Sequence, residues 1–151
     1  MKSPLEERTF KRLTEAGLKF EYEGVTFVLQ PSFALESIES GKKIKKVRDV
    51  KYTPDFIGDT WIIETKGHRT PVFDLRWKLF KYFLHLNKLD YKLYMPRNDK
   101  QVIEAINDIL NDKRHKSLLR KRRVSLKQSV ETDNQSSPIQ AKNGRRIRKG
   151  G

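Results

Sequence analysis

The sequence predicts a domain of the α/β class, with helices and a mixed α+β sheet, followed by a basic tail. Segments with apolar residues at helical spacing alternate with short β-branched and aromatic segments, in the approximate order αβββαβα. The 151 residues suffice for one domain with a real core. Residues 113–151 contain 13 Lys and Arg against 2 Asp and Glu. We therefore expect a folded domain over residues 1–112 and a tail over residues 113–151, helical at first and then disordered from about residue 128.

The first predicted element is a helix that begins at Pro4. Ser3 can cap it, Pro4 suits the first helical position, and Glu6 completes a capping-box spacing. Gly17 can end the helix. Residues 20–29 then predict a strand that bends at Gly24.

The next segment is less regular. Residues 31–41 are expected to form a loop, or an extension in which Phe33, Leu35 and Ile38 are partly buried. Residues 42–51 are strongly basic and partly alternating, which predicts an exposed strand. Lysines on an edge strand can simply discourage aggregation, but the position of this segment before Pro54 and Asp55 favours contacts with phosphates.

The second half predicts a helix, a strand and a further helix. Asp74 can cap a helix that runs to about Asn87, residues 91–95 suit a strand, and Asn98 or Asp99 can cap a helix that ends near Asp112. Trp77 and Tyr82 can stack on bases, although aromatic residues at helical spacing are more often core. The residues expected to face the core are Leu75, Leu79, Phe80, Phe83, Leu84 and Leu86 in the first helix, and Val102, Ile103, Ile106, Ile109 and Leu110 in the second.

Composition narrows the classes of function. The formal net charge is +14, which suits a polyanionic partner. The absence of cysteine excludes a disulfide framework and a thiolate zinc site. No apolar run is long enough for a membrane span, so we expect no membrane partner. Three scattered histidines lack zinc spacing, and among them His68 is the one placed to contact phosphate.

Two carboxylates and a lysine form the most informative pattern in the chain. Asp55 precedes the apolar residues 56–57, and Glu64 follows the apolar residues 61–63, with a turn between the two segments. If these segments pair as antiparallel strands, Asp55 approaches Glu64. Glu64 and Lys66 then point to the same face because side chains alternate along a strand. Two carboxylates at one point suit Mg²⁺ or Mn²⁺, and a neighbouring lysine can orient a water molecule. The alternative is a surface hairpin with an ordinary Glu–Lys pair.

The arrangement of Pro54, Asp55, Glu64 and Lys66 resembles the PD-(D/E)XK nuclease superfamily. Residues 3–7, 16–23, 52–56 and 64–67 look like the endonuclease I type of phage Holliday-junction resolvase. Residues 66–80 look more like small phage and prophage nucleases of the same superfamily, so the chain departs from the resolvases in its second half.

The resemblance implies a restriction-endonuclease-like core and a set of site residues. Asp55 and Glu64 would bind Mg²⁺ or Mn²⁺, with the Thr65 backbone carbonyl and Glu6 as further ligands. Lys66 would position or activate the attacking water. The catalytic residues expected on this basis are Asp55, Glu64, Lys66 and Glu6.

The expected function is that of a metal-dependent DNA endonuclease, structure-selective for branched DNA such as Holliday junctions and phage-encoded. One alternative is a non-catalytic DNA-binding or virion-associated protein with a nuclease-like fold, and another is an RNA-binding or RNA-processing protein. Two cuts across a junction require two active sites, so a homodimer stays open. We expect the protein to be located in the cytoplasm, which for a phage protein is that of the host cell. The virion is the alternative location.

Basic residues in three regions are expected to contact DNA. They lie in the basic strand, after Lys66, and in the tail, where a solubility or targeting role is the alternative. For Arg69 and Arg76 the alternative is a surface salt bridge. The candidates are Lys42, Lys43, Lys45, Lys46, Arg48, Arg69, Arg76, Arg120, Lys121, Arg122 and Arg123.

Overall fold

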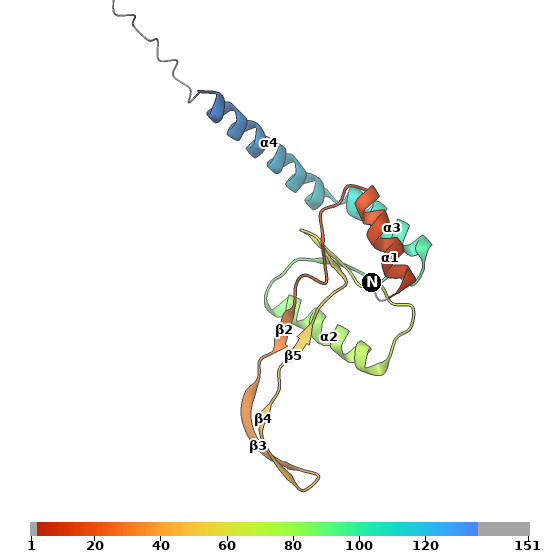
Figure 1. Cartoon of the computed structure of the whole chain (residues 1–151), viewed down its shortest axis with the longest axis vertical. Helices are drawn as coiled ribbons and strands as arrows, with labels where there is room; N and C mark the ends of the chain where they lie inside the picture. Colours follow the sequence, from red (N-terminus) through yellow and green to blue (C-terminus); the bar gives the residue numbers. More distant parts are fainter. Residues whose placement is uncertain (1–2, 136–151) are drawn as a thin grey trace, which may run out of the picture. The chain divides into compact units, whose positions relative to one another are not determined.

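The computed structural model describes residues 3–135 and confirms the mixed α/β class, with four helices and a mixed sheet among those residues (Figure 1). The helices are α1 (Pro4–Glu15), α2 (Pro71–Leu86), α3 (Asp99–Asn111) and α4 (Lys113–Gln135). The strands are β1 (Glu21–Tyr22), β2 (Phe27–Gln30), β3 (Phe33–Glu39), β4 (Lys42–Val47), β5 (Val50–Tyr52), β6 (Phe56–Ile57), β7 (Trp61–Ile63) and β8 (Lys92–Tyr94). The single strand predicted over residues 20–29 is two short strands that belong to different sheets.

A four-stranded sheet in the order β1-β6-β7-β8 forms the centre of the domain. The β1–β6 and β6–β7 pairs are antiparallel, whereas β7 and β8 are parallel. The parallel pair is joined by α2, as a crossover between parallel strands requires. The remaining strands form two antiparallel pairs, β2–β5 and β3–β4.

Helices cover both faces of this sheet because its central strands are apolar on both sides. Phe56, Trp61 and Ile63 pack in a cluster with buried residues of α1 and α3. The intervening residues Ile57 and Ile62 pack with Phe73, Trp77, Phe80 and Leu84 of α2 and with Tyr52. Successive strand residues point to opposite faces, so the short run from Trp61 to Ile63 supports both layers.

Helices α1 and α3 are joined by a buried seam and an ion pair. Ser3 caps α1 as predicted, since its side chain accepts a hydrogen bond from the Glu6 backbone N–H. Leu13 and Val102 are fully buried between the helices and the sheet. The Arg12 guanidinium donates to both carboxylate oxygens of Asp99, in the first turn of α3. This bidentate pair fixes α1 against the start of α3.

Residues 33–47 form a two-stranded hairpin, so the loop or partly buried extension predicted for residues 31–41 is wrong. Figure 1 shows β3 and β4 extending away from the helices as a ribbon. Phe33, Leu35 and Ile38 are exposed, with 79% of the Ile38 surface accessible. A two-stranded ribbon has no second layer to cover its side chains, which explains the difference. The basic segment 42–51 divides into β4 in this hairpin and β5, which pairs with β2.

Helix α2 differs from the prediction in both its start and its buried face. Thr70, rather than Asp74, caps the helix and accepts a hydrogen bond from the Phe73 N–H. The buried residues are Phe73, Trp77, Phe80 and Leu84, which confirms the core assignment of Trp77. Tyr82 is exposed, so its core assignment was wrong. The residues predicted to face the core but found exposed are Leu75, Leu79 and Leu86, together with Ile103 and Leu110 of α3.

The chain divides by its contacts into two units, Met1–Lys116 and Ser117–Gly151, so the division falls at Lys116 rather than at Asp112. Helix α4 continues to Gln135, beyond the end predicted near Lys127. The disorder predicted for residues 136–144 lies outside the described residues. Within residues 3–135, no helix combines the length and the apolar character that a membrane crossing needs.

Phe80 provides a test of the α2 layer. Its side chain is fully buried and stacks on Tyr52, with ring centroids 4.5 Å apart. We expect Phe80→Ala to lower the free energy of unfolding by about 3–5 kcal/mol, the usual cost of removing a buried aromatic ring. Leu35→Ala, at a 56% exposed position in β3, is the control and should change stability by less than about 0.5 kcal/mol. Chemical denaturation of both variants measures the difference, and equal effects would contradict this packing.

Candidate functional site

Asp55 and Glu64 lie opposite each other at one end of the β6–β7 pair. The register matches Phe56 with Ile63, so the next residues outward are Asp55 and Glu64. Gly58, Asp59 and Thr60 connect the two strands as predicted. Both carboxylates are buried, with exposures of 8% and 5%. A surface hairpin with an ordinary Glu–Lys pair does not describe this arrangement, because neither acid is in solvent.

Backbone hydrogen bonds to the segment after β8 hold Glu64 and Lys66 in place. The Glu64 N–H donates to the Tyr94 carbonyl (2.9 Å), and the Lys66 N–H donates to the Pro96 carbonyl (3.1 Å). These bonds continue the parallel ladder past Ile63, so the two side chains share a face. Lys66 Nζ lies 3.9 Å from Glu64 Oε1 and 4.4 Å from the centre of the Phe73 ring. The lysine is thus held over the carboxylates while a third of its side chain stays exposed.

Hydroxyl and amide donors fix the other two acids. Asp55 Oδ2 accepts hydrogen bonds from the Thr65 backbone N–H (2.7 Å) and from the Thr65 hydroxyl (2.6 Å). Glu6, buried in the first turn of α1, accepts a hydrogen bond from the Tyr22 hydroxyl (3.0 Å). The negative charge of Glu6 contributes to raising the pKa of Asp55, so Glu6 faces the same region. Helix α1 and the ends of strands β6 and β7 therefore bring Glu6, Asp55 and Glu64 into one region.

The electrostatics of this cluster oppose ionisation. Burial first, and then the charge of Asp55, raises the pKa of Glu64 to about 7. Burial also raises the pKa of Asp55, although the hydrogen bonds from Thr65 counteract the effect. Carboxylates whose ionisation is suppressed in this way gain from a positive partner. Lys66 supplies one charge to the cluster of acids.

Tyr52 and Glu64 carry buried polar atoms that form no hydrogen bond of good geometry among the described residues, although the two side chains lie close enough to interact with each other. These atoms are the Tyr52 hydroxyl oxygen and Glu64 Oε2. Burial raises the pKa of Tyr52, and the nearby charge of Glu64 raises it further. A buried unsatisfied carboxylate oxygen is costly, and such atoms are frequent where a ligand belongs.

A pocket of about 460 Å³ brings these residues together. All four predicted catalytic residues and Thr65 line it, and so does Arg76. Sequence reasoning missed the contributions of Glu23, Lys51, Tyr52, Thr53, Thr70, Val72 and Phe73. Thr70, Val72 and Phe73 belong to the N-terminus of α2, where the helix dipole favours an anion.

The remaining predicted DNA contacts fall in three places. Arg69 forms an ion pair with Asp74, Nε to Oδ1 2.6 Å, and does not line the pocket. Lys42, Lys43, Lys45 and Lys46 lie in β4, where Lys43 pairs with Glu36 of β3 at 2.8 Å, and Arg48 follows that strand. Arg120, Lys121, Arg122 and Arg123 are exposed on α4. His68 is exposed outside the pocket.

The donor set fits a hard divalent cation. Asp55 and Glu64 offer carboxylate oxygens, the ligands that Mg²⁺ and Mn²⁺ prefer, and Glu64 Oε2 is buried without a hydrogen bond of good geometry among the described residues. Over the described part of the chain, no group of three His, Asp or Glu side chains is close enough to count as a metal-binding cluster. Asp55 and Glu64 are therefore the residues that would hold the ion, while the roles of Glu6 and of the Thr65 carbonyl stay predictions.

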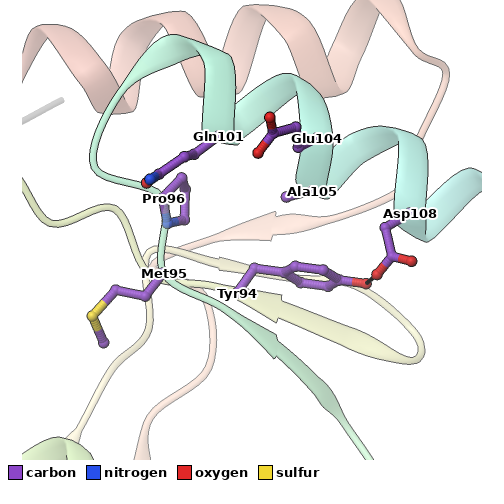
Figure 2. Close-up of a pocket in the computed structure, with 7 residues that line it drawn as sticks. All are labelled: Tyr94, Met95, Pro96, Gln101, Glu104, Ala105 and Asp108. Atoms are coloured by element: carbon purple, nitrogen blue, oxygen red, sulfur yellow. Dashed lines mark hydrogen bonds between the residues drawn. The ribbon is translucent and has the colours of Figure 1, made fainter.

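A second pocket of about 460 Å³ lies between β8 and α3 (Figure 2). Its acids are Glu104 and Asp108 of α3, and the Tyr94 ring lies beneath the helix with its hydroxyl at Asp108, whereas the Met95 side chain points away. The Tyr94 hydroxyl donates to Asp108 Oδ2 at 2.7 Å.

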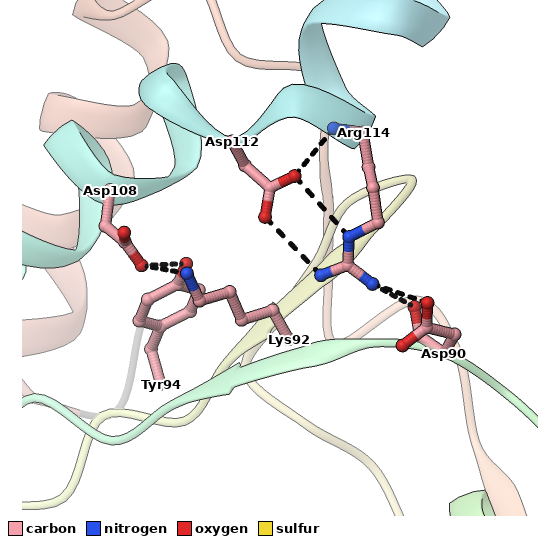
Figure 3. Close-up of polar contacts among 6 residues, drawn as sticks. All are labelled: Asp90, Lys92, Tyr94, Asp108, Asp112 and Arg114. Carbon is pink, nitrogen blue, oxygen red and sulfur yellow. Dashed lines mark hydrogen bonds and ion pairs between the residues drawn. The ribbon is translucent and has the colours of Figure 1, made fainter.

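Asp108 of this second pocket and the neighbouring acids Asp90 and Asp112 are paired with cations (Figure 3). Lys92 Nζ lies 2.5 Å from Asp108 Oδ2 and holds the pKa of that carboxyl below its usual range. Arg114, at the start of α4, contacts both Asp112 and Asp90 and ties the α3–α4 junction to the segment before β8. These contacts are structural, so the Asp55–Glu64 pocket is the stronger candidate for chemistry.

The raised pKa of Glu64 makes a prediction about stability. In the metal-free protein, Glu64 binds a proton more tightly when folded (pKa about 7) than when unfolded (4.5). The stabilisation of the folded protein by the proton on Glu64 is therefore fully present below pH 4.5 and is lost as the pH rises through 7. This loss lowers the free energy of unfolding by about 3 kcal/mol. We expect Glu64→Gln to remove this loss, so that the variant is the more stable protein at pH 8.

Denaturation in the presence of a chelator, at pH 5 and at pH 8, measures the effect. Glu104→Gln, at an exposed position of α3, is the control and should keep the wild-type pH dependence. A wild-type protein and a Glu64→Gln variant with the same pH dependence would contradict the electrostatics described above.

Comparison with known proteins gives a family but no activity. A family model described as "Protein of unknown function (DUF1064)" matches residues 2–104, which include every residue that lines the Asp55–Glu64 pocket. Searches of curated proteins and of solved structures returned no match. Because the model covers more than half of the 151 residues, the chain belongs to the DUF1064 family.

Proposed function

We propose that this protein is a DNA endonuclease of the PD-(D/E)XK type that hydrolyses phosphodiester bonds with Mg²⁺ or Mn²⁺. The observation that carries the proposal is the buried pair Asp55 and Glu64 with Lys66 Nζ 3.9 Å from Glu64. Two acids and a lysine in that order, on an antiparallel strand pair, match the expectation from the superfamily resemblance. A purely structural pair of buried acids would be expected to have a cationic partner for each acid, whereas among the described residues only Lys66 forms an ion pair with this pair, through Glu64.

The chain's own residues have distinct roles in this proposal. Asp55 and Glu64 would hold the divalent cation, and the hydrogen bonds from Thr65 fix the position of the Asp55 carboxylate. Lys66 positions the attacking water and is itself held by the Phe73 ring. Arg76 and the N-terminus of α2 face the phosphate. When bound, the cation would lower the pKa of a bound water and stabilise the charge that develops on the phosphate.

The β3–β4 hairpin is the proposed contact with the DNA backbone. It carries Lys42, Lys43, Lys45 and Lys46, and it leads into β5, whose Lys51 lines the pocket. Backbone contacts of this kind give affinity without reading sequence. Sequence-specific recognition is therefore not part of the proposal. Selectivity for branched DNA and an origin in a phage rest on the superfamily resemblance.

A cleavage assay tests the proposal directly. Purified protein with Mg²⁺ or Mn²⁺ is given a labelled four-way junction and a linear duplex of the same sequence. We expect junction cleavage that falls by about 10²–10³ or more in Lys66→Ala and Asp55→Asn, the usual cost of removing such a group. Lys100→Ala, at an exposed position of α3, is the matched control and should cut normally.

The outcomes of this assay separate the alternatives. Equal cutting of junction and duplex would keep the nuclease and remove structure selectivity. Tight DNA binding without metal-dependent cleavage of either substrate would contradict the nuclease proposal and favour a non-catalytic DNA-binding or virion role. Cleavage that survives in both Lys66→Ala and Asp55→Asn would contradict the assigned site.

The hairpin gives a second prediction. A variant with Gln in place of every lysine of β4 should bind all DNA sequences more weakly, and by a similar factor. The dependence of log affinity on log salt should also flatten by about 0.9 for each phosphate that the protein no longer neutralises. The charge-matched control places Gln at exposed lysines outside the hairpin, namely Lys11, Lys81, Lys88 and Lys100. An unchanged salt dependence in the hairpin variant would contradict a role for this ribbon in DNA binding.

A further inference from the structure

Helix α4 carries a run of positive charge beyond its first turn. Residues 113–130 contain eight Lys and Arg and no Asp or Glu. Arg114, in the first turn, is paired with Asp90 and Asp112. Four consecutive basic residues further along are all exposed, and we call them the α4 cations: Arg120, Lys121, Arg122 and Arg123. Three of them form no ion pair among the described residues, namely Arg120, Lys121 and Arg123.

Contacts at its first turn give α4 a fixed starting point. His115 is buried, and the Arg114 guanidinium donates to the Asp90 backbone carbonyl in addition to its ion pairs. These residues belong to the unit Met1–Lys116. The first hydrogen-bonded turn is the costly step in forming a helix, and here tertiary contacts support that turn. The α4 cations are therefore presented on a helix before a partner binds, which reduces the ordering cost of binding.

The α4 cations point to all sides of the helix. They are consecutive, and successive residues of a helix are about 100° apart around its axis. A flat anionic surface, such as a membrane or the acidic face of a protein, contacts only one side of a helix. Cations on the other sides would then have no partner, so a flat surface matches this pattern poorly.

Duplex DNA offers phosphates on more than one side of a bound helix. Its major groove is about 12 Å wide, and a helix with its side chains is about 10–12 Å across. A helix in the groove therefore has the phosphates of both strands beside it. With 23 residues, α4 is about 35 Å long, close to one turn of the duplex.

We propose that α4 lies in the major groove of duplex DNA, where the α4 cations neutralise phosphates of both strands. The choice of DNA among polyanions rests on the proposed nuclease function, whereas the contact itself does not involve the Asp55–Glu64 pocket. Phosphate contacts give affinity without reading sequence, so α4 holds the protein on any DNA duplex. The major groove of A-form RNA is too deep and narrow for this contact, so α4 favours DNA over RNA.

Equilibrium binding of the full chain, with a chelator present to prevent cleavage, tests the contact. The α4 variant has Gln in place of all four α4 cations. We expect its affinity for a DNA duplex to fall by about tenfold or more, and the slope of log affinity against log salt to flatten by about 0.9 for each lost phosphate contact. An RNA duplex of the same sequence should bind the wild type more weakly and respond less to the change. The charge-matched control, which should lose much less affinity for DNA, has Gln at Lys11, Lys81, Lys88 and Lys100.

Chemical protection tests the groove. Guanine N7 lies on the major-groove edge of the base pair, so the wild type should slow its methylation by dimethyl sulfate and the α4 variant should not. Equal losses of affinity in the α4 variant and the control, equal binding of the DNA and RNA duplexes, or unprotected guanine N7 would each overturn the proposal. An α4 variant that binds DNA normally but no longer binds vesicles of anionic phospholipid would also overturn it, in favour of a membrane surface.

Cleavage separates this proposal from the proposed function. At saturating DNA in a single-turnover assay with Mg²⁺, the α4 variant should cut at the wild-type rate, because its pocket is unchanged. A wild-type protein that binds DNA through the α4 cations but cuts nothing would contradict the nuclease and support the α4 contact. Normal cleavage by the wild type, with unchanged DNA affinity in the α4 variant, would overturn the α4 contact alone.

Discussion

The burial of Asp55 and Glu64 near each other, at the end of the β6–β7 pair, has an electrostatic cost that the surrounding structure must offset. Two acids with exposures of 8% and 5% are held at the end of one strand pair, and burial together with their mutual repulsion raises the pKa of Glu64 to about 7. Such an arrangement weakens a small domain unless something compensates for it. The compensation comes from the Thr65 donors, from Lys66 above the Phe73 ring, and from the ladder that ties this segment to β8.

The central strands can carry this site because they are supported on both faces. Strand β7 is three residues long and fully buried, with Trp61 and Ile63 packed toward α1 and α3 and with Ile62 packed toward α2. The chain leaves this apolar strand directly at Glu64. The same layer that covers Ile62 also supplies Phe73 and the N-terminus of α2 to the pocket. The packing of α2 against β7 therefore also positions the part of α2 that lines the pocket.

The strand-pair site was predictable because its signals are local. Apolar residues after Asp55 and before Glu64, with a short turn between them, fix the antiparallel pairing. The face of α2 was not predictable, because Leu75, Leu79 and Leu86 have the same period as the buried set, and only the tertiary fold decides between the two stripes. Tyr52 and Thr70 reach the pocket because the tertiary fold brings β5 and the start of α2 beside the strand pair, which no local sequence pattern indicates. The apolar residues of β3 suggested burial, but the β3–β4 ribbon leaves them exposed.

The proposed divalent-cation site of Asp55 and Glu64 should be partly protonated when the ion is absent, because burial raises the pKa of Glu64 to about 7. Isothermal titration of Mn²⁺ into the metal-free protein at pH 7, in buffers of different ionisation enthalpy, measures both binding and proton release. Because ligands must lose their protons to bind a metal, we expect saturable binding with proton release, both lost or strongly reduced in Glu64→Gln. Absence of saturable binding, or binding without proton release that persists in Glu64→Gln, would contradict a cation site at Asp55 and Glu64.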